Sequence, residues 1–407
     1  MTDDLLVTNI AQLVTPMGRG AARGRAMRDL DVTTDAAIAV RHGRVRWCGR
    51  RTECTGDAAR IMDAGGCAVV PALVDPHTHL VWGGDRLADF EARASGLDYE
   101  AILAGGGGIR HTVAETRATG VTQLRREARS RIARMMQAGA TVIEVKSGYG
   151  DTWEGERRQL EVIRLLRTDT RARIEPTMLF HLPPRDPAHR DEYIAQAVAE
   201  WIPSLMRDGA ATAVDVFIER DAFSVADADA LLGAARAAGL AVKVHVDQFS
   251  VLGGLEMALR HGALSVDHLE ASGTPQIAAL AMSTTVGVIL PGVTLHLGIA
   301  SAPARAFIDA GSAIAIGTDC NPGSSPLASM ALAMALAVRL NGLTPAEALT
   351  ASTANAAAAL GITDVGRIAP GMAADFLLLR SDDWRDLPYT LGEDAVERVI
   401  IAGTEMH

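Results

Sequence analysis

Short apolar segments alternate with longer Ala-rich amphipathic segments from about residue 68 to about residue 320. The apolar segments are rich in Val, Ile and Leu, as strands buried on both faces are, and the segments between them have the periodicity of helices. Eight strands are predicted: AVVPALV (68–74), TVIEVKS (141–147), IEPTMLF (174–180), AVDVFIE (213–219), AVKVHV (241–246), LSVDHL (264–269), VGVILP (286–291) and AIAIGTD (313–319). Eight successive strand–helix units predict an α/β fold with a closed, TIM-like (β/α)8 barrel.

An open, doubly wound sheet is the alternative arrangement of such units. Proteins of that type commonly carry a G-x-G-x-x-G turn directly after the first strand. No turn of this kind follows residue 74. The sequence therefore favours the barrel.

The two ends of the chain follow a different pattern. Residues 1–67 contain the alternating segments LLVTNI and AIAVRHGRVRWCG, and residues 366–407 contain GRIAPGMAADFLLLR and AVERVIIAGTE, which predict antiparallel β structure. Neither end has enough apolar residues for a core of its own. We therefore expect both ends to form one composite β-sandwich domain beside a barrel domain that spans residues 68–365.

Composition and charge exclude several classes of protein. Of the 407 residues, 48% are hydrophobic and 22% are charged, as in an ordinary globular protein. A net charge of -10 argues against non-specific binding to nucleic acid. No apolar segment reaches the ~18 residues of a membrane span, and MTDDLLVTNI lacks the basic start of a signal peptide. We expect a cytoplasmic protein with no membrane partner, whose four cysteines are reduced thiols.

Histidine and aspartate are concentrated at the carboxyl ends of the predicted barrel strands, where the catalytic groups of such barrels stand. The residues are His77 and His79 at strand one, His181 at strand three, His245 at strand five, His268 at strand six and Asp319 at strand eight. Five of the eleven histidines in the chain occupy these positions, which is more than chance placement would give.

His77, His79, His245 and Asp319 are predicted to bind a metal ion. Residues i and i+2 of a strand share a face, so His77 and His79 both point into the barrel mouth. Three imidazoles and one carboxylate suit zinc or iron. A single histidine at a strand end is more often a hydrogen-bonded core residue, so the prediction depends on the whole set.

A metal held by these ligands predicts hydrolysis at carbon. The ion would lower the pKa of bound water toward ~7 and polarise a nearby carbonyl. Asp319 would act as a general base toward the water and then as a general acid toward the leaving nitrogen. His268 would hydrogen-bond the attacking water or the developing oxyanion.

A site with two metals is the alternative, because Lys146 could be a carboxylated, bridging lysine. Lys146 is on the predicted second strand, however, and the fourth strand contains no lysine. One metal is therefore favoured, and Lys146 is expected to form a salt bridge or to support a loop.

Three features near the barrel mouth are candidates for binding a substrate. Arg86 follows His79 by seven residues and could bind a carboxylate with two parallel hydrogen bonds. Tyr149 lies between two glycines that let the backbone bend, and the turn NPGSSP after Asp319 is rich in hydrogen-bond donors. On residue types alone, a surface arginine, a packed tyrosine and an ordinary turn are equally consistent with the sequence.

Longer motifs extend these single positions. The H-x-H strand, the later histidines, the strand-eight aspartate and the tail GRIAPGMAADFLLL resemble the amidohydrolase superfamily across nearly the whole chain. More narrowly, the chain resembles the imidazolonepropionases of histidine degradation. The motifs that carry this resemblance are DPHTHLVWGGDR, GGGGIRHTV, EVKSGYG, VHVDQFS, VDHLE and GTDCNPGSSP, of which EVKSGYG and GTDCNPGSSP are the most specific.

The resemblance implies a hydrolase that opens the ring of 4-imidazolone-5-propanoate with water to give N-formimidoyl-L-glutamate. It implies one Zn²⁺ or Fe ion per subunit on the matched His77, His79, His245 and Asp319, with hydroxide from the metal attacking the ring amide carbonyl and Asp319 as general base and acid. It also implies a homodimer. The substrate contacts that it implies are Arg86, Tyr99, Tyr149, His181, Gln248, Asn321, Gly323 and Ser324.

Two other functions remain open. Another mononuclear amidohydrolase, such as a deaminase of a nitrogen heterocycle, would use the same metal but would release ammonia without opening a ring. A non-catalytic scaffold that kept the barrel would be expected to lack metal ligands, and all four are present in this chain.

Overall fold

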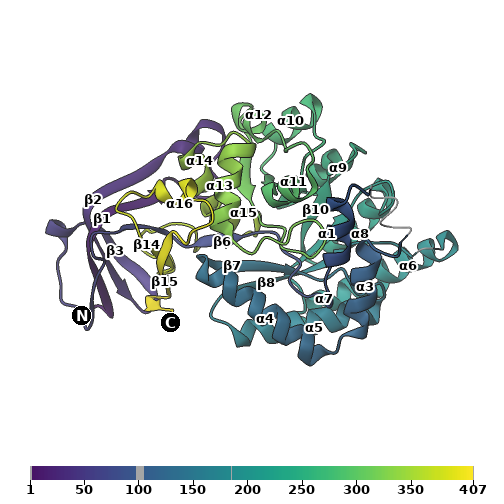
Figure 1. Cartoon of the computed structure of the whole chain (residues 1–407), viewed down its shortest axis with the longest axis horizontal. Helices are drawn as coiled ribbons and strands as arrows, with labels where there is room; N and C mark the ends of the chain where they lie inside the picture. Colours follow the sequence, from purple (N-terminus) through teal and green to yellow (C-terminus); the bar gives the residue numbers. More distant parts are fainter. Residues whose placement is uncertain (1, 98–104, 185, 407) are drawn as a thin grey trace.

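Eight parallel strands form a barrel in the computed structural model, which describes residues 2–97, 105–184 and 186–406 (Figure 1). The strands are β6 (Leu73–Asp75), β7 (Ala140–Lys146), β8 (Arg173–Phe180), β9 (Ala213–Phe217), β10 (Ala241–Val246), β11 (Ser265–His268), β12 (Val286–Ile289) and β13 (Ala313–Ile316). Each strand pairs with the next one along the chain. The predicted (β/α)8 barrel is confirmed.

The barrel closes just beyond the ends of its first and last strands. Asp319 N donates to His77 O and His79 N donates to Cys320 O, each over 3.0 Å. Thr78 lies between these two bonds and forms a parallel bridge with Cys320. The segment that carries the H-x-H pair is therefore itself the seam of the barrel.

Helices connect the strands and cover the outside of the barrel. The main helices are α4 (Val121–Gln137), α5 (Trp153–Asp169), α7 (Ile202–Asp208), α8 (Val225–Ala237), α9 (Gly254–Arg260), α10 (Thr274–Ala281), α12 (Ala304–Asp309), α13 (Met330–Leu340), α14 (Pro345–Ala351) and α15 (Ala354–Ala359). Further helices are α1 (Leu87–Ala94), α3 (Ile109–Ala118), α6 (Arg190–Gln196), α11 (Pro291–Leu297) and α16 (Asp386–Tyr389). The start of α8 shows why such a helix begins where it does, since Ser224 and Asp227 bond to each other's backbone N–H in a capping box.

A second sheet is built from both ends of the chain and lies at one side of the molecule together with the two termini (Figure 1). Its strands, in addition to the short β5 described below, are β1 (Leu5–Pro16), β2 (Leu30–Arg41), β3 (Arg44–Arg50), β4 (Ile61–Asp63), β14 (Phe376–Leu379), β15 (Val396–Ile401) and β16 (Thr404–Glu405). Val7, Ile38, Phe376 and Ile400 meet in one buried cluster. As expected, neither end forms this core alone.

A tight turn joins β2 and β3 into a hairpin in this sheet. Arg41 pairs with Arg44, so His42 and Gly43 make a two-residue turn, and both have positive φ, 51° and 70°. Positive φ at both positions is what a type I′ turn requires, and its twist matches that of the flanking strands.

One strand prediction is wrong, because residues 68–74 are two strands. β5 (Ala68–Pro71) pairs with β1 and β14 in the sheet of the chain ends, and only β6 belongs to the barrel. The whole stretch is buried, with Val69 in the core of the end sheet and Leu73 in the core of the barrel. An uninterrupted apolar run has the same sequence pattern whether its residues are buried in one hydrophobic core or in two. The domain boundaries remain a prediction.

Two expectations from composition can be compared with the structure. All four cysteines are free thiols, as predicted. Among the residues that the structure describes, no helix combines the length and the apolar character needed to cross a bilayer.

Phe376→Ala should lower the free energy of unfolding by about 3–5 kcal/mol, because it leaves a cavity in the core of the end sheet. Phe376 is fully buried there, whereas Ile61 on β4 of the same sheet is 67% exposed. Ile61→Ala is the matched control and should change stability by less than about 0.5 kcal/mol. Urea unfolding of both variants measures the difference, and equal effects would contradict the position of this core.

Candidate metal centre

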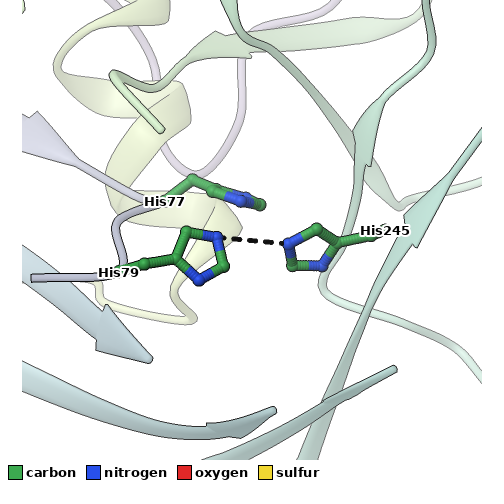
Figure 2. Close-up of side chains that lie close together, drawn as sticks. All are labelled: His77, His79 and His245. Atoms are coloured by element: carbon green, nitrogen blue, oxygen red, sulfur yellow. Dashed lines mark hydrogen bonds between the residues drawn. The ribbon is translucent and has the colours of Figure 1, made fainter. Parts of the chain in front are cut away.

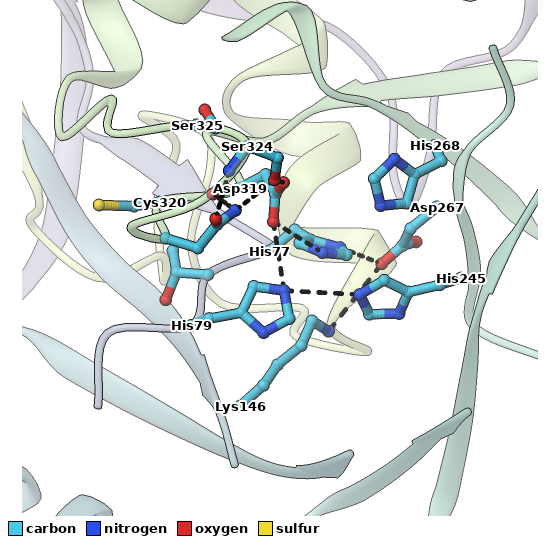
Figure 3. A network of polar contacts seen from close by, with 12 residues as sticks. His77, His79, Lys146, His245, Asp267, His268, Asp319, Cys320, Ser324 and Ser325 are labelled. Atoms are coloured by element: carbon cyan, nitrogen blue, oxygen red, sulfur yellow. Dashed lines mark hydrogen bonds and ion pairs between the residues drawn. The ribbon is translucent and has the colours of Figure 1, made fainter. Parts of the chain in front are cut away.

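Four side chains converge at the carboxyl end of the barrel (Figures 2 and 3). His77 and His79 lie after β6, His245 is on β10 and Asp319 follows β13. The Nε2 atoms of His79 and His245 are 3.5 Å apart. Asp319 Oδ1 is 3.2 Å from His79 Nε2 and 3.5 Å from His77 Nε2. Bonds of ~2.0–2.1 Å place the ligands of a tetrahedral zinc ion roughly 3.4 Å apart, so the spacing fits one ion.

Two of these candidate ligand atoms have no hydrogen-bond partner within the described part of the chain. His77 Nε2 and Asp319 Oδ1 are both buried and have no hydrogen bond to any other residue that the structure describes. A buried polar atom left in this state costs about 1–3 kcal/mol. A cation bound between the rings would coordinate these atoms and remove this cost. Imidazole nitrogens are common ligands of transition metals. His77, His79 and His245 could hold a metal ion, and Asp319 stands where a fourth ligand would stand.

Two carboxylates orient two of the histidines. His77 Nδ1 is 2.6 Å from Asp267 Oδ2, and His245 Nδ1 is 3.0 Å from Asp215 Oδ1. A proton on each Nδ1 is then shared with a carboxylate, and each Nε2 lone pair faces the centre. Burial lowers the pKa of His77 well below its usual value and that of His245 to about 4. Both rings are therefore neutral, which is the form that binds metal.

Two lysines and a glutamate complete a buried network of charges around the histidines. Figure 3 shows one of the lysines, Lys146, beside Asp267 and His245. Lys146 Nζ is 2.7 Å from Glu144 Oε2 and 2.8 Å from Asp215 Oδ2. Lys243 Nζ is 2.8 Å from Glu144 Oε1 and 3.7 Å from Asp267 Oδ2. The salt bridge expected for Lys146 is confirmed, and its ammonium group is occupied by carboxylates instead of bridging two metals.

The strand periodicity explains why these charges meet. Glu144 and Lys146 are two residues apart on β7, and Lys243 and His245 are two residues apart on β10. Alternate residues of a strand share a face, so each pair points into the barrel. The inside of this barrel is therefore ionic near the metal site.

Glu144, Asp215, Lys243 and Asp267 were missed in the sequence analysis. Each of these four is a charged residue inside a predicted strand that is otherwise apolar, as in EVK, VDV, VKV and VDH, and this pattern could have identified them. A charge buried in a strand of this kind needs a partner, and a search for such residues would have found the network.

His268 lies at the edge of the same cluster. Its ring centroid is 5.4 Å from that of His245, and its Nδ1 is 3.4 Å from Glu270 Oε2. Burial would lower the pKa of His268, but Glu270 and Asp319 outweigh this effect and raise it. His268 and Leu269 both have positive φ, 88° and 72°, which is strained for residues other than glycine.

Tyr149 and His181 pack against the metal site. The ring of His79 is 5.9 Å from that of Tyr149 and 5.5 Å from that of His181, between centroids, and the last pair is stacked. Tyr149 and His181 are themselves 5.6 Å apart. The structure therefore brings both predicted residues beside a metal ligand.

Arg86 and the turn after Asp319 lie together. Arg86 is held by Asp89 and by Thr112 Oγ1, the latter over 3.3 Å. A Cβ atom on Gly323 would lie 3.1 Å from Arg86 Nη1, so glycine allows this close approach.

The turn also connects directly to Asp319. Asn321 Oδ1 accepts from the N–H groups of Gly323 and Ser324, both over 2.8 Å. Ser324 Oγ donates to Asp319 Oδ2 over 3.1 Å. The predicted residues of the NPGSSP turn are thus brought to the metal site.

The predicted contacts of Gln248 and Tyr99 stay predictions. Gln248 is 9% exposed and follows β10, but within the described residues no hydrogen bond or ion pair joins its side chain to the others. Tyr99 lies outside the described residues.

Several known proteins are similar to this chain in sequence. The amidohydrolase family model matches residues 68–406. Imidazolonepropionase from Deinococcus deserti is 55% identical over 99% of this chain and 100% of its own length. That from Deinococcus radiodurans is 54% identical over the same shares, and that from Chloroflexus aggregans is 46% identical over 98% of this chain and 97% of its own.

The chain belongs to the imidazolonepropionase family of amidohydrolases. Solved structures of other amidohydrolases share the fold. A triazine hydrolase from Arthrobacter aurescens has a TM-score of 0.80 at 17% identity and covers 99% of this chain and 94% of its own. An adenosine deaminase from Xanthomonas campestris with bound zinc has a TM-score of 0.73 at 21% identity, over 99% and 93%. Identities this low support the fold alone.

Asp267→Asn should weaken metal binding by about 10–100-fold, because an amide no longer holds His77 as a carboxylate does. The control is Asp229→Asn, since Asp229 bonds to His261 over 2.9 Å on the surface and should leave metal affinity unchanged. Titration of metal-free protein with Zn²⁺ against a competing chelator measures the affinity. Equal affinities in the two variants would show that Asp267 does not orient a ligand.

Proposed function

We propose that this protein hydrolyses 4-imidazolone-5-propanoate to N-formimidoyl-L-glutamate with one bound metal ion. The observation that carries the proposal is the convergence of four buried ligand atoms, two of them without partners, in a chain of the imidazolonepropionase family. The electrostatic surroundings support it, since charged residues hold the rings of His77 and His245 toward one point.

The ion that we propose is Zn²⁺ or Fe, bound by His77, His79, His245 and Asp319. When bound, such an ion lowers the pKa of a water molecule and polarises a carbonyl. Imidazole and carboxylate are ligands for both metals, so the donor set fits either.

Asp319 is the residue that we propose to transfer the proton. The water oxygen bonds to the ring carbonyl carbon, the carbon–nitrogen bond breaks, and the proton taken up by Asp319 passes to the departing ring nitrogen. Ser324 Oγ, 3.1 Å from Asp319 Oδ2, orients this carboxylate. His268, on the other side of the site, would donate a hydrogen bond to the attacking water or to the oxygen that becomes negative.

The remaining residues would hold the substrate. Tyr149 and His181 lie beside His79 and would contact the imidazolone ring. Arg86 would pair with the propanoate, because a guanidinium binds a carboxylate with parallel hydrogen bonds. Gln248, Asn321, Gly323, Ser324 and Tyr99 complete the predicted contacts. The homodimer and the cytoplasmic location that the sequence suggested also stay predictions.

Metal-replete protein should hold about one metal ion per chain and should consume imidazolonepropanoate, seen as loss of its ultraviolet absorbance. Protein stripped with a chelator should be inactive and should recover when Zn²⁺ or Fe²⁺ is added back. Release of ammonia from another heterocycle, with the imidazolone untouched, would show that the chain is a deaminase instead.

Arg86→Ala should raise KM by about 10–100-fold with unchanged metal content, because a charged hydrogen bond to the substrate is lost. Arg164→Ala is the matched control, since Arg164 pairs only with Glu161 on the exposed face of α5 among the contacts described. Steady-state kinetics and metal analysis on the same preparations measure both quantities. Loss of metal from the Arg86 variant would mean that this residue supports the metal site and not the substrate.

A further inference from the structure

The loop that carries Tyr149 is held by two side chains of the helix that follows it. Glu156 Oε2 accepts from Gly148 N over 2.7 Å, and Glu156 Oε1 accepts from Gly150 N over 2.6 Å. Gln159 Oε1 accepts from Tyr149 N over 2.8 Å. Three successive N–H groups beyond β7, which pair with no strand, are thus satisfied by α5.

Gln159 also contacts the segment of the metal ligands. Its Nε2 donates to Val81 O over 2.6 Å, two residues beyond His79. Arg131 on α4 donates to the neighbouring carbonyls of Leu80 and Trp82, over 2.9 and 3.1 Å. One amide therefore ties the backbone of Tyr149 to the backbone that follows the H-x-H pair.

The backbones of the loop and the helix are in direct contact. A Cβ atom on Gly150 would lie 2.2 Å from Glu156 N, and one on Gly155 would lie 2.2 Å from Gly150 O. Only glycine fits at both positions. The close approach of Gly150 and Gly155 brings the Glu156 carboxylate within reach of two N–H groups of the loop. Glu156 is 4% exposed and Gln159 is 0% exposed, so water does not replace these bonds.

The position of the Tyr149 ring depends on this loop. Tyr149 is 4% exposed, and its ring lies beside those of both His79 and His181, 5.9 and 5.6 Å away between centroids. A shift of the loop by a fraction of this distance would move the ring relative to the metal site. Displacements of about 1 Å in residues that position a substrate lower rates by roughly 100-fold.

We propose that Glu156 and Gln159 are positioning residues that fix Tyr149 against the metal site and thereby set how the substrate ring is held. This inference rests on the proposed function, in which Tyr149 contacts the substrate. Neither residue reaches the metal ligands through its side chain, so both act through the loop.

The test is a double-mutant cycle. Gln159→Met and Glu156→Gln, which nearly preserve shape, are made alone and together with Tyr149→Ala. Glu156→Gln should lower kcat/KM by about tenfold in the parent protein, the effect of one lost buried hydrogen bond. Gln159→Met should lower it by at least as much, because it loses the bonds to both Tyr149 N and Val81 O. In the Tyr149→Ala background, where no ring remains to be positioned, each should lower it less than about twofold.

Matched controls separate this role from a general loss of structure. Gln123→Met and Glu161→Gln change the same residue types at exposed contacts of α4 and α5 and should leave kcat/KM unchanged. Metal content and the midpoint of thermal unfolding are measured for every variant, and Tyr149→Leu replaces Tyr149→Ala if the latter does not fold. Equal losses in both backgrounds, or loss of metal, would overturn the proposal.

A measurement without substrate keeps the two proposals apart. Amide hydrogen exchange in residues 147–152 should become faster in both positioning variants and stay unchanged in β10. Unchanged exchange in the loop would overturn the positioning role, whatever the activity. A parent protein that leaves the imidazolone intact would instead overturn the proposed function, and the exchange result would still decide the role of Glu156 and Gln159.

Discussion

The structure depends on bringing three imidazoles and a carboxylate together in a buried site, where the candidate ligand atoms of the three histidines lie within 4.8 Å of one another. Without a cation, the buried nitrogen and oxygen atoms of these groups would lack bonding partners or would repel one another. The surrounding residues must therefore hold the side chains in the form that binds metal. Asp267 and Asp215 do so by direct contact with His77 and His245. These two carboxylates are themselves buried and need counter-charges.

Lys146 and Lys243 supply the counter-charges, and Glu144 lies between the two lysines. Burial alone would raise the pKa of Glu144, but the lysines outweigh it and lower the pKa below its usual value. A buried ion pair gains little over an apolar pair, because removal from water is costly. Its value in this barrel is to fix the orientation of metal ligands on β10 and on the segment after β6.

Side chains from the helices support the irregular backbone at the barrel mouth. Beyond the strand ends, neighbouring segments diverge and their N–H and C=O groups lose their strand partners. The loop after β7 donates to Glu156 and Gln159, and the segment after His79 accepts from Gln159 and Arg131. Tyr149 and His79, which lie beyond the ends of β7 and β6, are thereby connected to backbone held by side chains of α4 and α5.

The barrel and the clustering of His77, His79 and His245 could be predicted from the sequence because each rests on a local pattern. Apolar strands alternating with helices indicate the barrel, and the i, i+2 spacing of His77 and His79 places both rings on one side. The division of residues 68–74 between two sheets could not be read, because burial in either core demands the same residue types.

Sequence alone therefore determined the barrel and the candidate histidines at its carboxyl end, whereas the tertiary structure decided how their side chains are held. The pairings of Lys146 with Asp215 and of Gln159 with Val81 join positions 69 and 78 residues apart. Such contacts arise only when the strands close into a barrel and the helices pack against it. No local periodicity records them, because the pairing depends on the shape of the closed barrel and not on spacing along the chain.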